Sequence, residues 1–353
     1  MDNSIQRNMK QLLAFLLLAA TLGCIDETTL DVTGAEGTIV VDGLIGDSLR
    51  VYTIEVNESA VVGVGTEYIH PPISGAQVTV VSDAGERIVF AETDPGHYEA
   101  EMATENGRSY HVEVTLPNGR RIVSAPEVSR PSPAIAEVQV KPVSREVQTS
   151  AGFFTSEQFI DLSATVDLSE ADEPVFLRWR FEGEYEFREW VDQPAFPKNC
   201  YVGHRIGFNN LPLLDSRDFE AGPVDTDVLL SLPFDYKFSY NYGYNIFQYR
   251  ISRREYDYWR AVQDVTSVDG SFFDPPPGTV RGNLRFEDDE EALVLGYFSV
   301  SGTTYVRRFT NTNELQIPAQ RHCQVWPPSS RPDGCTNCLE LRRSTDVKPG
   351  YWP

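Results

Sequence analysis

The sequence has few of the residues and motifs that usually carry chemistry. Its five histidines are scattered along the chain, with none of the close spacings that would gather zinc ligands around an open catalytic position. It contains no Gly-x-Ser-x-Gly elbow, and no phosphate-cradling Gly-rich loop opens a helix. These absences predict no catalytic residue, no metal site and no cofactor. The five histidines are His70, His97, His111, His204 and His322.

Basic residues are also scarce. The chain has 30 Lys and Arg against 52 Asp and Glu, a formal net charge of -22 at pH 7. Nucleic acids and anionic lipid head groups attract basic patches, so a chain this acidic should repel both. We therefore exclude nucleic acid as a partner. The hydrophobic fraction of 41% is normal for a globular protein.

Long hydrophobic runs are missing beyond the N-terminus. The one apolar stretch, Leu12 to Leu22, is shorter than the ~20 residues that a membrane-spanning helix needs. It follows the basic residues Arg7 and Lys10 and is followed by the small Gly23, an order typical of a secretory signal. Residues 1–23 are therefore predicted to be a cleaved signal peptide.

Cys24 directly follows this signal, and the arrangement resembles a bacterial lipoprotein signal, in which the cysteine is lipidated. An ordinary secretory signal with a bystander cysteine is the alternative. Asp26 and Glu27 resemble the surface-export tag of Bacteroidota lipoproteins. The expectation is an outer-membrane protein anchored only by lipid at Cys24 and facing the cell exterior, with residues 24–35 as a tether.

The next segment has the pattern of a small β-domain. Asn118-Gly119 between alternating runs is the strongest short-range hairpin signal, and strands at such short intervals are typical of a β-sandwich. The segment also resembles prealbumin-like sandwiches, through Gly75-Ala76, Gly96-x-Tyr98 and Gly107-x-x-Tyr110. We predict an Ig/prealbumin-like β-sandwich over residues 36–126. The predicted strands span 38–45, 51–56, 76–81, 87–92, 109–116 and 120–125.

A Pro-containing stretch, 125–138, marks the boundary to a larger β-sandwich domain over residues 127–353, because proline favours extended chain. In VFLRWRFE (175–182) the apolar residues alternate with Arg178, Arg180 and Glu182, which predicts a half-buried strand. Ser252 and Glu255 form a capping box that predicts one short helix near 252–266. The fold class is thus all-β with a single capped helix.

An alternating aromatic run, PFDYKFSYNYGY, is the best candidate for a contact surface. If it forms one strand, six rings share one face: Phe234, Tyr236, Phe238, Tyr240, Tyr242 and Tyr244. Tyrosine suits interfaces because it joins a large ring to a polar tip. The alternatives are a buried sheet face and a binding platform, with Tyr236, Tyr240, Tyr242 and Tyr244 as the candidate contacts.

Four cysteines remain after Cys24: Cys200, Cys323, Cys335 and Cys338. A zinc ribbon needs a second Cys-x-x-Cys, and a thioredoxin-like centre needs a βαβ setting that an all-β pattern does not provide. Outside the cytosol an even number favours disulfides, here with three possible connectivities. We expect two structural bridges that fix the C-terminal segment, and spacing does not decide the pairing.

Four stretches in order resemble one known family: VVDGLIGD with GAQVTV, then FQYRISRREYDYW, then GSFFDPPPGTVRGN with VLGYFSVS, and the paired cysteines before KPGYWP. The chain resembles the Bacteroidota outer-membrane lipoproteins of domain-of-unknown-function 4249. The resemblance implies a surface lipoprotein encoded beside a TonB-dependent receptor, acting as its accessory subunit.

The leading hypothesis is a non-enzymatic accessory or ligand-binding partner of a TonB-dependent receptor in nutrient uptake. Its ligand, whether small molecule, glycan or peptide, stays open. Two alternatives of other classes are a degradative glycosidase or peptidase with dispersed acidic residues, and an adhesin or structural envelope protein.

Overall fold

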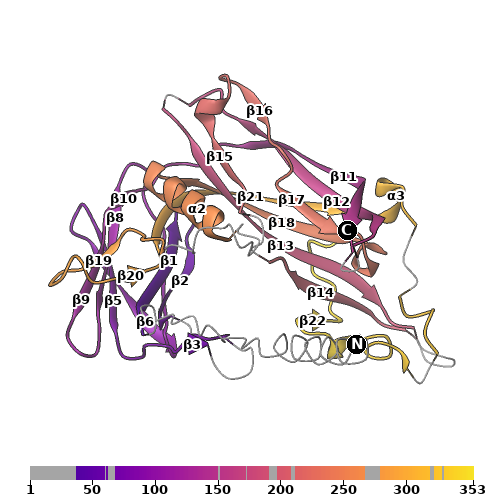
Figure 1. Cartoon of the computed structure of the whole chain (residues 1–353), viewed down its shortest axis with the longest axis horizontal. Helices are drawn as coiled ribbons and strands as arrows, with labels where there is room; N and C mark the ends of the chain where they lie inside the picture. The colour runs from indigo at the N-terminus through magenta and orange to yellow at the C-terminus, as the bar shows by residue number, and fades with distance from the viewer. Residues whose placement is uncertain are drawn as a thin grey trace, which may run out of the picture. The chain divides into compact units, whose positions relative to one another are not determined.

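The computed structural model describes residues 37–59, 61–62, 68–149, 152–171, 173–190, 197–207, 211–266, 279–318, 322–327 and 330–353 (Figure 1). The predicted signal peptide, Cys24 and the tether lie outside these residues. The chain divides into residues 1–36 and one compact unit, residues 37–353. Within the described residues, no helix has both the length and the apolar character needed to cross a membrane.

Most of the described chain is β-structure, in one large mixed sheet and one small antiparallel sheet. The first strands of the large sheet are β1 (Ile39–Gly46), β2 (Arg50–Glu58), β5 (Gln77–Ser82), β6 (Arg87–Asp94), β7 (His97–Met102), β8 (Ser109–Thr115), β9 (Arg121–Ser124) and β10 (Glu127–Val128). Its later strands are β13 (Phe176–Arg188), β14 (Asn199–Arg205), β15 (Leu213–Asp215), β18 (Tyr242–Ile251), β19 (Leu284–Phe286), β20 (Val294–Leu295), β21 (Phe298–Thr310) and β22 (Ser344–Thr345).

The small sheet is built on a long hairpin. It contains β11 (Ile135–Gln148), β12 (Phe154–Asp167), β16 (Pro223–Asp225) and β17 (Leu230–Pro233). A separate pair joins β3 (Val61–Val62) to β4 (Tyr68–Ile69). The helical elements are α2 (Arg253–Thr266), α3 (Thr312–Leu315), η1 (Ser216–Asp218), η2 (Tyr236–Phe238) and η4 (Cys338–Glu340).

Strands β8 and β9 follow directly from the sequence pattern. Residues of β8 alternate between buried and half-buried positions, with Tyr110, Val112 and Val114 inside. The predicted Asn-Gly turn then leads into β9: Gly119 has φ +85° and donates its N–H to the Leu116 carbonyl. Glycine tolerates this left-handed conformation, which fixes the register of the two strands.

Strands from late in the chain complete the first hydrophobic core. Antiparallel pairing joins β19 to β9, and parallel pairing joins β21 to β1, which makes the large sheet mixed. Phe286 and Phe298 are therefore buried in the same cluster as Val41 and Ile122. Residues near 284–300 thus share one hydrophobic core with β1. The predicted domain boundary near residue 126 stays a prediction.

The second core lies around β12, β13 and β18, and it contains all four disulfide cysteines. Leu177, Trp179 and Phe181 of β13 face it, as their alternation predicts. The other face of β13 differs from the expectation of a solvent-exposed surface. Arg178 is buried there because α2 packs over this face, with the Phe176 and Tyr256 rings 5.3 Å apart.

The Pro-containing segment between the cores is extended, as predicted, and is bound along β18 and β21. Gln248 Nε2 donates to the Pro133 carbonyl at 2.7 Å, and Arg250 Nη1 donates to the Pro131 carbonyl at 3.2 Å. The Gly302 N–H donates to the carbonyl of Arg130. Proline lacks an N–H donor and so interrupts a regular ladder, and these bonds satisfy the carbonyls of the segment instead.

Candidate functional site

A cavity of about 670 Å³ lies where β1, β2, β13, β18 and α2 meet, and we call it the arginine cleft. A second cavity of about 560 Å³ shares Glu55, Arg178, Arg180 and Leu211 with it. Sizes of this order are typical of ligand sites. The cleft is lined by Asp42, Gly43, Leu44, Arg50, Val51, Tyr52, Thr53, Glu55, Arg178, Arg180, Leu211, Tyr249, Trp259, Val262 and Thr266.

Arg178 lies at the junction of the two cavities and is 8% exposed. Its guanidinium carbon lies 4.6 Å from the ring centre of Trp259 and 5.2 Å from that of Tyr249. Among the described residues its Nε has no hydrogen-bond partner, and its one ion pair joins Nε to Glu255 Oε1 at 3.7 Å. A buried guanidinium with free donors is the group that binds carboxylates and phosphates best.

Glu255 forms the ion pair that positions Arg178. Its Oε2 accepts from Ser299 Oγ at 2.7 Å, and its Oε1 accepts from Trp259 Nε1 at 3.1 Å. Burial raises the pKa of Glu255, while Arg178 opposes the rise. These three contacts fix the carboxylate and, through it, the position of the guanidinium.

The helix start differs from the predicted capping box in one respect. Ser252 Oγ accepts from the Glu255 N–H at 3.1 Å, as predicted, and α2 begins at Arg253. The Glu255 carboxylate does not take the reciprocal role, because it is turned toward Ser299 and Trp259. Glu255, which the sequence assigns to the helix cap, thus positions Arg178 in the cleft instead.

Two carboxylates open to the same cleft from neighbouring strands. Asp42 of β1 and Glu55 of β2 are direct partners in the antiparallel register. Asp42 is exposed to solvent and lines the cleft, and the protein around it partly desolvates its carboxylate. This desolvation raises the pKa of Asp42, with Glu55 adding to the rise and Arg178 opposing it. Like charges directly opposite each other destabilise a sheet, so the pair carries a cost in stability.

The alternating aromatic run does not form one strand, so the condition for six rings on one face is not met. Its chain leaves β17 at Pro233, makes the 3-10 turn η2, and enters β18 only at Tyr242. The reason is Asp235, whose carboxylate accepts the Lys237 N–H at 2.9 Å and caps the turn. A turn with three residues per repeat removes the two-residue alternation on which the prediction depends.

The four candidate tyrosines are divided between core and surface. Tyr242 and Tyr244 are 0% and 1% exposed, so a contact-surface role for them requires the fold to open. The Tyr242 hydroxyl bonds to His204 Nδ1 at 2.7 Å, and burial raises the pKa of Tyr242 and lowers that of His204. Tyr236 and Tyr240 are half-buried at the surface.

Tyr236 and Tyr240 line a separate cavity of about 270 Å³, the tyrosine pocket. His322 stacks on Tyr236 with ring centres 3.9 Å apart, and Arg188 lies 4.0 Å from the ring centre of Tyr240. Trp190, 44% exposed, adds an apolar surface. This pocket is the part of the predicted platform that remains accessible.

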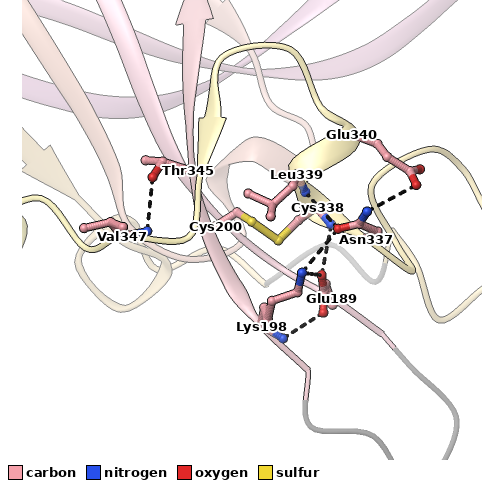
Figure 2. The surroundings of a disulfide bond; sticks show 9 residues. All are labelled: Glu189, Lys198, Cys200, Asn337, Cys338, Leu339, Glu340, Thr345 and Val347. Carbon is pink, nitrogen blue, oxygen red and sulfur yellow. Dashed lines mark hydrogen bonds and ion pairs between the residues drawn. A yellow bond between two sulfur atoms is a disulfide. The ribbon is translucent and has the colours of Figure 1, made fainter.

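Two disulfides fix the C-terminal segment beside this pocket. Cys200 bonds to Cys338, and Cys323 bonds to Cys335. Figure 2 shows Glu189 beneath the first bridge: its Oε1 accepts from the Cys338 N–H at 3.0 Å, and its Oε2 accepts from the Lys198 N–H at 2.8 Å. The expectation of two structural bridges is confirmed. Of the three possible connectivities, the structure has Cys200–Cys338 with Cys323–Cys335.

The histidines form no metal-binding cluster among the described residues, although His70 and His97 line one cavity together with Asp42 and Glu55. His97 lies near Glu55, His111 lies near Glu113, and His204 and His322 pack against tyrosine rings. The described residues contain no group of three His, Cys, Asp or Glu side chains placed to hold a metal ion.

Sequence reasoning missed the residues of the arginine cleft. The only signal for Arg178 and Arg180 was their alternation in a strand, which is also the pattern of a solvent-exposed face. Asp42 offered a weaker signal, as a single acid inside the apolar run VVDGLI.

The fold and the cleft define a mostly β protein with a preformed cavity in which arginine, carboxylate and aromatic side chains converge. A family model described as Domain of unknown function (DUF4249) matches residues 25–307, and the chain belongs to this family. The resemblance found in the sequence motifs is thereby confirmed. A search of curated proteins finds no match.

Proposed function

We propose that this chain is a non-enzymatic, ligand-binding outer-membrane lipoprotein that works as the accessory partner of a TonB-dependent receptor in nutrient uptake. The observation that carries the proposal is the arginine cleft, a preformed cavity with a buried cation and aromatic walls. The lipoprotein signal at Cys24 supports a lipid anchor, and the resemblance of the motifs supports a surface location and the receptor as partner.

The proposal includes two β-sandwich domains. One is Ig/prealbumin-like over residues 36–126, and the larger one covers residues 127–353. Two large hydrophobic cores support a division into two parts, and a smaller third cluster lies around Phe176 and Tyr256. The first core also contains Phe286 and Phe298 from the later range. Because β19, β20 and β21 return to the first core, the two domains would be firmly linked, and the cleft between β1, β2, β13 and α2 would keep a constant shape.

The test is a pull-down from mild detergent, with a tag inserted in the acidic turn between β19 and β20. This turn is exposed, and Asp288 contacts Arg120 only at the surface, so an insertion after Glu290 should leave the fold intact. A stoichiometric TonB-dependent receptor is expected to copurify. A chain that purifies alone would contradict the partnership. Cys24→Ala should release the protein from the membrane.

One observation favours a second candidate, a glycosidase. Retaining glycosidases hold two carboxyl groups about 5 Å apart, one of them with a raised pKa. Directly opposed residues on paired strands have Cβ atoms about 5 Å apart, which lets their carboxyl groups approach each other. Asp42 and Glu55 are opposed in this way beside aromatic rings. Turnover of a polysaccharide panel that Glu55→Gln abolishes would establish this function in place of simple binding.

A further inference from the structure

The arginine cleft presents separated charges of opposite sign. Arg178 forms its one described ion pair with Glu255 beneath it, and none with Asp42 or Glu55 across the cavity. Because Arg178 does not pair with either carboxylate across the cavity, each side can meet an opposite charge on a ligand, although Glu55 Oε1 also lies 3.7 Å from His97 Nδ1. In a protein of net charge -22, three arginines line this one cavity: Arg50, Arg178 and Arg180, of which Arg180 is paired with Glu182 at 2.8 Å.

Arg178 is suited to hold a carboxylate. Its burial removes competing water, and Trp259, Tyr249 and Glu255 restrict its orientation. A guanidinium fork binds a planar carboxylate through two parallel hydrogen bonds, and such charge-assisted bonds are about twice as strong as neutral ones. Nearby, Arg50 Nε is also buried without a hydrogen-bond partner among the described residues.

Asp42 and Glu55 are suited to hold a cation. Because the two side chains are cross-strand partners, their negative charges add on the same face of the sheet. A bound ammonium group would relieve the repulsion between the two carboxylates. Residues that break a local rule of stability in this way are most often found at functional sites.

The walls between these charged groups are apolar. Leu44, Val262 and Leu211 line the cavity together with the rings of Trp259 and Tyr249. Aromatic and aliphatic walls with a few convergent polar groups favour a ligand that has an apolar body. The second cavity continues from Arg178 past Arg180, so the ligand can extend beyond the first.

We propose that the arginine cleft binds a zwitterionic short peptide, with its carboxylate on Arg178 and its ammonium group between Asp42 and Glu55. An apolar peptide side chain lies against Trp259 and Val262. The inference deepens the proposed function by naming the ligand class, and it rests on the cleft being the ligand site of the lipoprotein.

The experiment compares three forms of one probe on the full-length protein in mild detergent, by isothermal titration calorimetry. The probes are the tripeptide alanyl-phenylalanyl-alanine, its C-terminal amide and its N-acetyl form. Each derivative removes one charge and little else. We expect the tripeptide to bind and each derivative to bind about ten to a hundred times more weakly, the loss typical of one charged hydrogen-bonding group.

Two variants test which residue holds each end of the peptide. Arg178→Gln should bind the tripeptide and its C-terminal amide with equal affinity. Asp42→Asn should bind the tripeptide and its N-acetyl form with equal affinity. Arg87→Gln and Asp288→Asn change exposed, ion-paired residues outside the cleft and serve as matched controls that keep both preferences. If Arg178→Gln fails to fold because Glu255 is left unpaired, Arg178→Lys keeps a charge there but lacks the fork and should still lose most of the preference.

The unmodified protein alone can overturn the proposal. Equal affinity for acid and amide, or no heat with any peptide at millimolar concentration, would exclude the zwitterion. Inorganic phosphate that competes as well as the tripeptide would make the cleft a simple anion site and contradict it too. The pull-down is independent: a receptor that copurifies while no peptide binds refutes the ligand class and leaves the partnership standing.

Discussion

The two disulfides should differ in their effect on stability, because they close loops of very different length. The Cys200–Cys338 bridge joins residues 138 apart, and Cys323–Cys335 joins residues 12 apart. Loop closure in the unfolded chain then gives about 5 kcal/mol for the first bridge and about 3 kcal/mol for the second. Nesting of the short loop inside the long one changes the first value little, because the dependence on length is logarithmic.

The perturbation is the replacement of each pair by alanine, as Cys200→Ala with Cys338→Ala and as Cys323→Ala with Cys335→Ala. All four cysteines are buried, so the packing lost at the sulfur atoms is similar in the two variants and largely cancels in the comparison. The remaining difference comes from loop length: loss of the Cys200–Cys338 bridge should lower the free energy of unfolding by about 2 kcal/mol more than loss of the short-loop bridge.

The assay is unfolding in guanidinium chloride under oxidising conditions, followed by the fluorescence of buried Trp179 and Trp352. The variant without the long loop should unfold at the lower midpoint. It should also show the larger increase in denaturant slope, because its unfolded chain is the less compact. Equal losses, or a greater loss from the short loop, would refute the entropic reasoning and point to the local contacts of Glu189 in its place.

Three further predictions concern charge and burial. The raised pKa of Asp42 means that the folded protein binds a proton more tightly than the unfolded chain, so stability declines as pH rises from about 4 through the raised pKa. Asp42→Asn should therefore have the higher melting temperature at neutral pH, and a difference that persisted at pH 3 would contradict this cause. Tyr242→Ala should lower the free energy of unfolding by about 3–5 kcal/mol, whereas half-buried Tyr240→Ala should cost under about 1 kcal/mol. Equal costs in urea titrations would contradict this division of the aromatic run. Glu255→Ala leaves Arg178 as a buried, unpaired charge and should cost about 3 kcal/mol or more in the same titrations, and a neutral result would show that water already solvates the guanidinium.

Much of the local structure is predictable from the sequence because its signals act over a few residues. The turn at Asn118 and Gly119 depends on one left-handed residue, and the start of α2 depends on the Ser252 hydroxyl. Both are found where the sequence predicts them. The strand at His97–Met102 is not among the predicted strands, although its apolar residues Tyr98, Ala100 and Met102 alternate strictly with polar ones and the pattern is that of a strand.

The cleft was beyond such reasoning because its members lie far apart in the chain. Asp42, Arg178 and Trp259 meet only after β13 has joined the sheet and α2 has covered it. An arginine that alternates with apolar residues has the same pattern whether water or a helix covers it. Tyr242 is a similar case: the elements packed around it bury its ring, and its alternating position in the sequence does not reveal this.

The sequence by itself thus determined the family, the strand content, the capped helix and the presence of four cysteines able to pair. Periodicity and capping operate within a turn or a strand, so one chain segment suffices to specify them. The tertiary structure alone decided the disulfide pairing, the parallel contact of β1 with β21, the burial of Arg178 and the division of the tyrosines. Each of these depends on which elements meet in the folded chain, and the Cys200–Cys338 bridge and the contact of β1 with β21 join segments more than 100 residues apart. The free energy of such contacts comes from shared burial, which no single segment specifies.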